Sequence, residues 1–476
     1  MNLNDLSGPL AAAPAPLADA FRVLYARRGD TPSADERRRA LAALDALVRE
    51  NVPAFCAALS QDFGSRSPHE TRLLEVFPAL EAIGHARRHL RAWMKPQPRS
   101  TSLWFLPGRS RVVFQPLGVV GIVVPWNYPL YLAVAPIVAA LAAGNRILVK
   151  MSEAAPATGE LLARLVAERF NATQLAVVNG DATVARAFVS LPFDHLLFTG
   201  STEVGRSVMR AAAENLTPVT LELGGKSPAI VGRGFDTREA ALRIAYGKCL
   251  NAGQTCVAPD YALVPEERVD EFVGAATKAI ESLYPTLRDN ADYTAIVNAR
   301  HRERLRGYVE DAVSQGARVI EVNPAREDLT ASPKMAPHLV TGVKDTMRLM
   351  QEEIFGPLLP VVAYRSLDDA LAYVNARARP LALYVFENEA RDVERVISGT
   401  TSGGVTVNET FLHVGQEDLP FGGVGASGMG EYHGRAGFET FSKRKAVFHQ
   451  SRFSGLRLFR PPYGARFEAL LRWLVR

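Results

Sequence analysis

The stretch Glu222–Cys256 reads ELGGKSPAIVGRGFDTREAALRIAYGKCLNAGQTC, and the rest of the chain is organised around it. Its first residue, Glu222, lies near the end of the apolar run Val219–Leu223. A Gly-Gly turn and a helical stretch follow. The stretch ends on a cysteine in a small polar turn. Strands and helices alternate on both sides, so two α/β units are expected to meet near residues 222–260.

Apolar runs of strand length recur along the chain with helical patterns between them. They lie at 118–124, 146–149, 175–178, 195–198 and 219–223, and again at 261–264, 317–321, 359–363, 382–386 and 404–407. Such alternation is typical of a mostly parallel sheet covered by helices on both faces. The predicted fold class is α/β, with two doubly wound, Rossmann-like units and a smaller additional element.

Composition sets broad limits on function. A chain of 476 residues with 47% apolar and 22% charged residues is expected to fold into two or three globular domains. The net charge of +5 is spread out and forms no basic stripe with aromatics, so no nucleic-acid partner is expected. Three cysteines and an N-terminus without a secretion-signal pattern favour reduced thiols and a cytoplasmic protein.

One segment requires a test for membrane insertion. Pro116–Gly144 has 29 residues without a charge, but Pro125, Pro129 and Pro136 interrupt it. A strand, a turn and a buried helix over 132–143 explain the pattern better than a membrane span. No membrane association is expected.

The two ends of the chain have helical patterns. Ser33–Glu36 and Ser67–Glu70 are capping boxes, and the second opens a helix to about Trp93, in a layer without obvious chemistry. The segment 95–110 reads as an irregular connector. An amphipathic helix carrying Phe467, Leu470, Leu471 and Leu474 closes the chain, and packing on its own protein or a partner subunit is favoured over a membrane.

Cys256 and Glu222 form a candidate nucleophile and base. A thiol on a turn reacts well only when its proton is removed, and a glutamate among apolar residues and glycines has the raised pKa of a general base. Taken singly, a strand-end glutamate and a buried structural cysteine are the more common interpretations. The combination of ELGGKSP with GQTC is much more specific. No metal is predicted, because His85 and His89 lack a third ligand.

A dinucleotide site is expected after the strand 195–198. Gly423–Gly428 fits G-x-G-x-x-G but lacks the strand and helix that this fingerprint requires, so it is rejected. Phe198–Gly205 has that context: Gly200 makes the turn, Ser201 offers a hydroxyl, and a helix begins near Glu203. Lys150 and Glu153 close the strand 146–149 and can hold ribose hydroxyls.

Seven motifs together resemble the aldehyde dehydrogenase family. They are Pro125-Trp-Asn-Tyr-Pro129, Lys150 with Ser152-Glu153, Phe198-Thr-Gly-Ser-Thr202, Glu222-Leu-Gly-Gly-Lys226, Gly253-Gln-Thr-Cys256, Glu352-Glu-Ile-Phe-Gly-Pro357 and Pro420-Phe-Gly-Gly423. All occur in the family's order and cover nearly the whole chain. Ser427-Gly-Met-Gly-Glu-Tyr-His-Gly434 resembles the branch that contains class 3 and coniferyl aldehyde dehydrogenases.

The resemblance implies roles for the matched positions. Cys256 is the nucleophile, Glu222 the general base, and Asn127 forms an oxyanion hole with the Cys256 N–H. The residues that would contact NAD or NADP are Pro125, Trp126, Lys150, Ser152, Glu153, Gly200, Ser201, Glu353 and Phe355. Tyr128 and Phe411 would line the substrate pocket. Glu153 would favour NAD mildly over NADP, because its charge repels a 2′-phosphate.

It also implies an architecture. An NAD(P)-binding domain would comprise residues 1–97 and 117–224, and a catalytic domain residues 225–430. Residues 98–116 and 431–476 would form an oligomerisation element and C-terminal tail of a homodimer.

The implied activity is NAD(P)-dependent oxidation of aromatic or medium-chain aldehydes, coniferyl aldehyde among them, to carboxylic acids through a cysteine thiohemiacetal and thioester. Three alternatives remain. A cofactor-free cysteine acyltransferase or hydrolase would need a histidine such as His413 or His433 beside Cys256. A CoA-acylating dehydrogenase would generally lack Glu222, and a non-catalytic relative would not need Cys256, Glu222 and Asn127 together.

Overall fold

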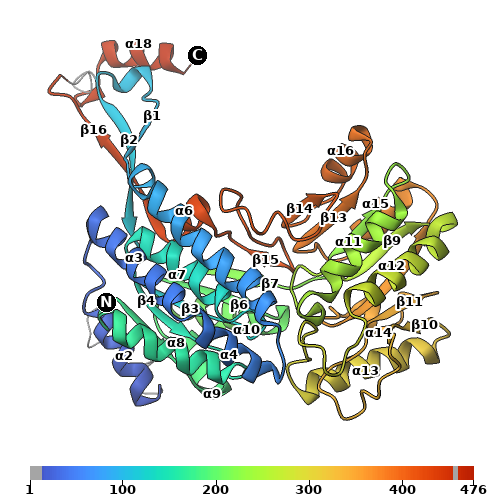
Figure 1. Ribbon diagram of the computed structural model, residues 1–476. Coiled ribbons are helices and arrows are strands. Elements are labelled where there is room, and N and C mark those ends of the chain that lie inside the picture. Colours follow the sequence, from blue (N-terminus) through green and yellow to red (C-terminus); the bar gives the residue numbers. More distant parts are fainter. Residues whose placement is uncertain (1–12, 454–458, 476) are drawn as a thin grey trace.

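The computed structural model describes residues 13–453 and 459–475, which form two α/β lobes and a projecting arm (Figure 1). Three sheets build these parts. The absence of a secretion-signal pattern was inferred partly from residues 1–12, which lie outside the described residues. No helix within the described ranges is both long enough and apolar enough to cross a bilayer.

The first lobe holds a six-stranded sheet in the order β15-β7-β6-β3-β4-β5. Its strands are β3 (Val119–Val123), β4 (Arg146–Lys150), β5 (Leu175–Val178), β6 (His195–Gly200), β7 (Val219–Leu223) and β15 (Gly428–Met429). All pairs are parallel except β15 with β7. The five strands predicted upstream of Glu222 are therefore confirmed.

Side chains alternate between the two faces of this sheet, as a doubly wound fold requires. On β3, Val120 and Ile122 join the core that contains α3, α6, α7 and α8. Val119 and Val123 join the core that contains α2 and α9. The helix predicted over 132–143 is α7 (Tyr131–Ala143), and all of its residues are buried, which explains its unbroken apolar composition.

The second lobe holds a seven-stranded sheet in the order β10-β11-β12-β9-β8-β13-β14. Its strands are β8 (Pro228–Val231), β9 (Tyr261–Pro265), β10 (Arg318–Glu321), β11 (His338–Thr341), β12 (Leu358–Tyr364), β13 (Ala382–Phe386) and β14 (Gly404–Val407). The five predicted strands are present. The sequence interpretation missed β8 and β11, because a proline begins β8 and another, Pro337, directly precedes β11, and proline is typical of turns and loops.

The helices surround these sheets. Those of the first lobe are α2 (Ala15–Tyr25), α3 (Ala34–Glu50), α4 (Val52–Phe63), α5 (Pro68–Thr71), α6 (Phe77–Trp93), α7, α8 (Pro156–Arg169), α9 (Ala182–Val189), α10 (Thr202–Ala213) and α17 (Gly434–Thr440). Those of the second are α11 (Thr237–Cys249), α12 (Val269–Leu283), α13 (Ala299–Ser314), α14 (Arg348–Gln351), α15 (Leu367–Asn375) and α16 (Ala390–Gly399).

The predicted helix from Ser67 to Trp93 is interrupted. A π-helical turn, η2 (Arg72–Val76), separates α5 from α6. The Ser67 hydroxyl accepts from the His69 and Glu70 N–H groups, but the Glu70 carboxylate turns inward instead of completing a capping box. The capping box predicted at Ser33 is confirmed.

The arm consists of an antiparallel sheet of β1 (Gln97–Arg99), β2 (Arg109–Pro116) and β16 (Ser442–His449), with α18 (Ala465–Leu474) at its end (Figure 1). The segment expected to be irregular thus contains β1 and the start of β2. The Trp104 and Trp473 rings meet edge to face at 5.2 Å and join the 103–105 turn to α18. The closing helix is confirmed, and it buries none of its own residues.

Candidate active site

The turn that carries Cys256 has an unusual backbone. It follows α11 through the 3₁₀ segment η4 (Leu250–Gly253), where Asn251, Ala252 and Gly253 have φ values of 51°, 50° and 73°. A Cβ on Gly253 would lie 2.3 Å from the Gly356 carbonyl oxygen, so only glycine fits. Cys256 is partly exposed beyond this turn, whereas Cys56 and Cys249 are buried.

Glu222 lies near the end of β7, opposite Thr199 of β6 and Gly428 of β15. Both of its carboxyl oxygens are buried and have no hydrogen-bond partner among the described residues. Burial raises the pKa of Glu222 well above its ordinary value, and the charge of Glu431 adds to the effect. A carboxyl group in this state is able to take up a proton near neutral pH.

Burial also raises the pKa of the Cys256 thiol, to about 12, and the carboxylates of Glu353 and Glu222 contribute. The Cys256 and Val257 N–H groups act in the opposite direction. The thiol is therefore neutral at rest, and a nearby proton acceptor is needed for it to react.

Neither histidine considered as a partner of Cys256 is bonded to it. His413 Nδ1 lies 2.6 Å from Thr406 Oγ1, and His433 Nε2 lies 3.1 Å from the Tyr131 hydroxyl. Burial lowers the pKa of His413 to about 4 and that of His433 to about 3. These contacts give no support to a cofactor-free cysteine–histidine site.

Asn127 and Tyr128 lie against the nucleophile turn. Asn127 Nδ2 donates to the Gln254 carbonyl oxygen at 3.2 Å, and the Tyr128 hydroxyl bonds Thr255 Oγ1 at 2.7 Å. The Tyr128 ring is buried beside the turn. Its predicted place in a substrate pocket stays a prediction.

The other predicted pocket residue, Phe411, is half-buried and has a φ of 66°. Its ring stacks on Tyr384 with centroids 6.5 Å apart, and the Tyr384 hydroxyl donates to the Val257 carbonyl oxygen. This aromatic pair therefore lies next to the segment that follows Cys256.

Several predicted cofactor residues meet at the carboxyl edge of the first sheet. Val123 of β3 is the register partner of both Lys150 and Phe198, so the segments that follow these three strands are adjacent. Pro125 and Trp126 follow β3, Ser152 and Glu153 follow β4, and Gly200 ends β6. Ligands of open parallel sheets bind at this edge.

The groups at this edge are suited to a dinucleotide. Lys150 Nζ lies 3.2 Å from a Glu153 oxygen and 2.7 Å from the Gly180 carbonyl oxygen. Ser152 Oγ accepts from the Ala154 N–H, which leaves its hydroxyl proton free to donate. Ser201 is the N-cap of α10, whose first N–H groups and helix dipole favour a phosphate.

The second lobe reaches the same edge. The Glu353 carboxylate accepts from the Gly225 N–H, and a Cβ on Gly224 would lie 2.0 Å from it, so only glycine leaves room for this contact. The Trp126 and Phe355 rings meet at 5.3 Å. Burial raises the pKa of Glu353 to about 8.

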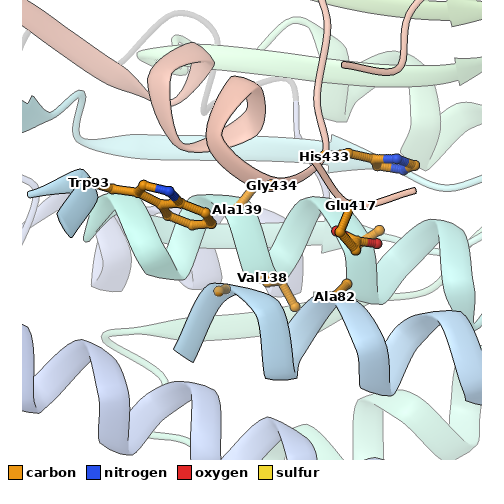
Figure 2. Close-up of a pocket in the computed structure, with 9 residues that line it drawn as sticks. Ala82, Trp93, Val138, Ala139, Glu417, His433 and Gly434 are labelled. Atoms are coloured by element: carbon orange, nitrogen blue, oxygen red, sulfur yellow. The ribbon is translucent and has the colours of Figure 1, made fainter. Parts of the chain in front are cut away.

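A small cavity of about 10 Å³ lies between α6, α7 and the Gly434 segment (Figure 2). It can hold about one water molecule, which excludes it as an aldehyde pocket. Glu417 and His433 line it, and burial raises the pKa of Glu417 to about 7. None of the predicted site residues lines this cavity.

Four residues that the sequence did not assign to the site also contact it: Arg66, Glu70, Glu75 and Asn251. Glu70 bonds the Asn251 N–H from 181 residues away, and Arg66 bonds the Asn127 carbonyl oxygen from 61 residues away. Three of them are charged, but other polar and charged residues surround them in the sequence, so their charge gave no local signal.

Comparisons with known proteins show which proteins the chain is similar to. A model described as aldehyde dehydrogenase family matches residues 26–447. A probable coniferyl aldehyde dehydrogenase of Pseudomonas aeruginosa is 54% identical over 92% of each chain. A substrate-bound structure of Staphylococcus aureus AldH has a TM-score of 0.90 and 36% identity, and covers 100% of each chain.

Two further relatives bear on the cofactor. A Mycobacterium tuberculosis aldehyde dehydrogenase solved in complex with NAD+ has a TM-score of 0.84 and 31% identity, covering 91% of this chain and 90% of that one. The rat dimeric NADP-preferring aldehyde dehydrogenase is 39% identical over 89% of this chain and 92% of its own length.

Proposed function

The chain belongs to the aldehyde dehydrogenase family and is an NAD(P)-dependent enzyme that oxidises aldehydes to acids; on this premise, we propose that its substrates are aromatic and medium-chain aldehydes. We further propose that Cys256, Glu222 and Asn127 carry the chemistry. The observation that supports these roles best is the buried, unpartnered Glu222 carboxyl, close enough to raise the pKa of the partly exposed Cys256 thiol.

The first half-reaction begins when the partly exposed Cys256 thiol passes its proton to a water molecule and its sulfur bonds the aldehyde carbon. The carbonyl oxygen becomes an alkoxide, which the Asn127 Nδ2 and the Cys256 N–H stabilise by donating hydrogen bonds. Bound NAD(P)+ supplies the hydride acceptor. A thioester on Cys256 remains after the hydride has left.

In the second half-reaction Glu222 takes a proton from a water molecule, whose oxygen attacks the thioester. The carbon–sulfur bond breaks, the carboxylic acid leaves, and the proton held by Glu222 passes to the Cys256 sulfur, which regenerates the thiol and the Glu222 carboxylate. The raised pKa of Glu222 suits this task, because a weakly acidic carboxyl group accepts a proton readily.

The cofactor residues divide the dinucleotide between them in this proposal. Lys150, Ser152 and Glu153 hold the adenosine half, and Gly200 and Ser201 hold the pyrophosphate at the α10 N-terminus. Glu353 holds the nicotinamide ribose, with Phe355, Pro125 and Trp126 packed around it. The Glu153 carboxylate, which pairs with Lys150, would repel a 2′-phosphate on the adenosine ribose, and this charge supports a mild preference for NAD over NADP.

Coniferyl aldehyde is the proposed principal substrate. The relative named after that aldehyde and the aromatic pair of Phe411 and Tyr384 next to the nucleophile segment support it. Burying each extra methylene of a substrate contributes ~0.8 kcal/mol, or about fourfold in binding. If apolar side chains line the path to Cys256, larger apolar aldehydes therefore bind more tightly than small ones.

A homodimer joined through residues 98–116 and 431–476 is the proposed assembly. The name of the rat relative and the projecting arm support it, since Trp104 and Trp473 are more than half exposed in the single chain. A monomer mass by light scattering would contradict this assembly.

The substrate proposal is tested with coniferyl aldehyde, benzaldehyde, hexanal and acetaldehyde at fixed saturating NAD, with NADP in a parallel series. The first three should exceed acetaldehyde in kcat/KM by roughly two orders of magnitude. Acetaldehyde or a charged semialdehyde as the best substrate would refute the proposed substrate class and leave the family activity intact.

A further inference from the structure

A buried ion pair lies behind the candidate site. Arg66 Nη1 and a Glu75 oxygen are 2.9 Å apart, and both side chains are fully buried. The Arg66 guanidinium lies over the Phe63 and Tyr128 rings, at 4.8 and 4.9 Å from their centroids. Breaking a buried pair is costly, so its partners are held in a fixed geometry.

This pair fixes the segment that carries Asn127. Arg66 Nη1 donates to the Asn127 carbonyl oxygen at 3.0 Å. Glu75 accepts from the Leu130 and Tyr131 N–H groups at 2.8 and 3.2 Å. Glu75 lies in the π-helical turn η2, and such turns are frequent at functional sites.

Asn251 connects that segment to the nucleophile turn. Its Nδ2 donates to the carbonyl oxygens of Asn127 and Gln254, each at 3.1 Å. The Asn127 side chain donates to the same Gln254 oxygen at 3.2 Å. One amide group therefore bridges the backbones of the proposed oxyanion donor and the turn two residues before Cys256.

Glu70 in turn holds Asn251. Its carboxylate accepts the Asn251 N–H, with oxygens 3.2 and 3.3 Å from the nitrogen, and the Thr294 hydroxyl at 2.8 Å. Asn251 is fully buried and left-handed, a conformation that asparagine tolerates better than most residues. The contact with the Glu70 carboxylate, the two hydrogen bonds of the side-chain amide and the left-handed backbone thus all involve Asn251.

We propose that Asn251 is a positioning residue that sets the distance between the Asn127 side chain and Cys256. Glu70 holds Asn251 in place, and Arg66 holds the Asn127 backbone. The inference rests on the proposed roles of Cys256 and Asn127. An oxyanion donor works only when it already points at the developing charge, and a displacement of ~1 Å can cost about 10²-fold in rate.

The test variant is Asn251→Gly, which removes both bridging hydrogen bonds and accepts a positive φ without strain. With coniferyl aldehyde and NAD, the rate of the first NADH turnover should fall by about 10²-fold. The Kd of NAD should stay within about twofold, because Asn251 makes no contact with the cofactor edge.

The matched control is Asn145→Ala. Asn145 is equally buried, and its Nδ2 also donates to two backbone carbonyl oxygens, of Ala140 and Phe441, but at the opposite end of β4. Its loss should lower the melting temperature with less than about threefold effect on the first turnover. Equal losses of rate in both variants would reduce Asn251 to a general structural role.

A double-mutant cycle separates action through Asn127 from any other effect. Asn251→Gly should slow the first turnover by less than about threefold when Asn127 is already alanine. The same 10²-fold factor in both backgrounds would overturn the proposal. If Asn251→Gly does not fold, Glu70→Gln replaces it in the cycle, with the same two outcomes.

The wild-type enzyme separates this inference from the proposed function. If wild type forms no NADH with any aldehyde, the proposed function fails. If wild type turns over and Asn251→Gly does so at the same rate, only the positioning role fails.

Discussion

At the scale of single residues, desolvation is the main influence on the pKa values of the candidate site. Burial is the largest cause of the raised pKa of Cys256, Glu222 and Glu353 alike. Each carboxylate near the thiol raises its pKa further. The free enzyme therefore keeps its nucleophile protonated, and thiolate forms only when a proton acceptor or a bound cation favours it.

The reactivity of the Cys256 thiol in the free enzyme should therefore rise steadily with pH. Since its pKa is about 12, the thiolate fraction increases about tenfold per pH unit below that value. Inactivation by iodoacetamide, followed from pH 7 to 9.5 without NAD, should show a log-rate slope near one.

The Cys249→Ala variant is the control, because Cys249 is buried and its pKa is also raised to about 12. It should be inactivated as fast as wild type, whereas Cys256→Ala should have no oxidation activity to lose. A rate that levels off near pH 7 would mean that the free enzyme already holds a thiolate.

At the scale of elements, the nucleophile turn depends on left-handed backbone. Gly253 has a φ of 73° and touches the Gly356 carbonyl oxygen, so its conformation and its lack of a side chain are both needed. Phe355, next to Gly356, also has a positive φ of 49°. The backbone of the nucleophile turn therefore packs directly against the backbone of the Glu353–Gly356 segment, which holds two of the predicted cofactor residues.

The variant Gly253→Ala should be destabilised by about 1–2 kcal/mol from the left-handed conformation alone, and by more from the clash with Gly356. Thermal unfolding and kcat/KM measure the two consequences. Gly274→Ala is the matched control, because Gly274 lies in α12 with nothing near its missing Cβ.

The control should gain roughly 0.5–1 kcal/mol from its better helix propensity and keep full activity. If Gly253→Ala kept wild-type stability and kcat/KM, the close packing of the turn on Gly356 would be disproved.

The elements themselves were largely predictable from local patterns. Strands such as β5, β7 and β13 have the predicted bounds, because apolar runs between turn residues leave little choice. β8 and β11 were missed because a proline begins β8 and another directly precedes β11, as is typical of turns and loops. The Glu70–Asn251 contact spans 181 residues, and no periodicity along the chain reports such a contact.

The candidate site was predictable to a different degree. Motif resemblance selected Asn127 and Cys256, and the structure brings Asn127 onto the turn before Cys256. The N-terminal helices were expected to have no chemistry. That expectation missed the contact of Arg66 with Asn127, because Arg66 lies in the connection between α4 and α5, where the sequence does not distinguish a buried arginine from an exposed one.

At the scale of the whole molecule, charge is divided unevenly. Residues 97–116 and 442–476 hold 12 of the 55 basic and one of the 50 acidic residues, so this part carries +11 and the remainder −6. The described residues of these ranges form the arm, which projects from the lobes (Figure 1). Opposite charges favour its association with the lobes of a second copy, in agreement with the proposed homodimer.

The two lobes share the proposed reaction. The first contributes Glu222 and Asn127, and the second contributes Cys256 and Glu353. Thioester formation therefore depends on Cys256 of the second lobe, and thioester hydrolysis depends on Glu222 of the first lobe. The roles of Cys256 and Glu222 are the central claim. They can be tested separately, because Cys256 acts in thioester formation and Glu222 acts afterwards, in thioester hydrolysis.

The most direct test is a rapid-mixing measurement of NADH formation by Glu222→Gln with coniferyl aldehyde and saturating NAD. A burst near one NADH per active subunit should precede turnover slowed by about 10²–10⁴-fold, because the thioester forms but water is no longer activated. Wild-type steady turnover in Glu222→Gln would contradict the assignment of the base, and turnover in Cys256→Ala would contradict that of the nucleophile.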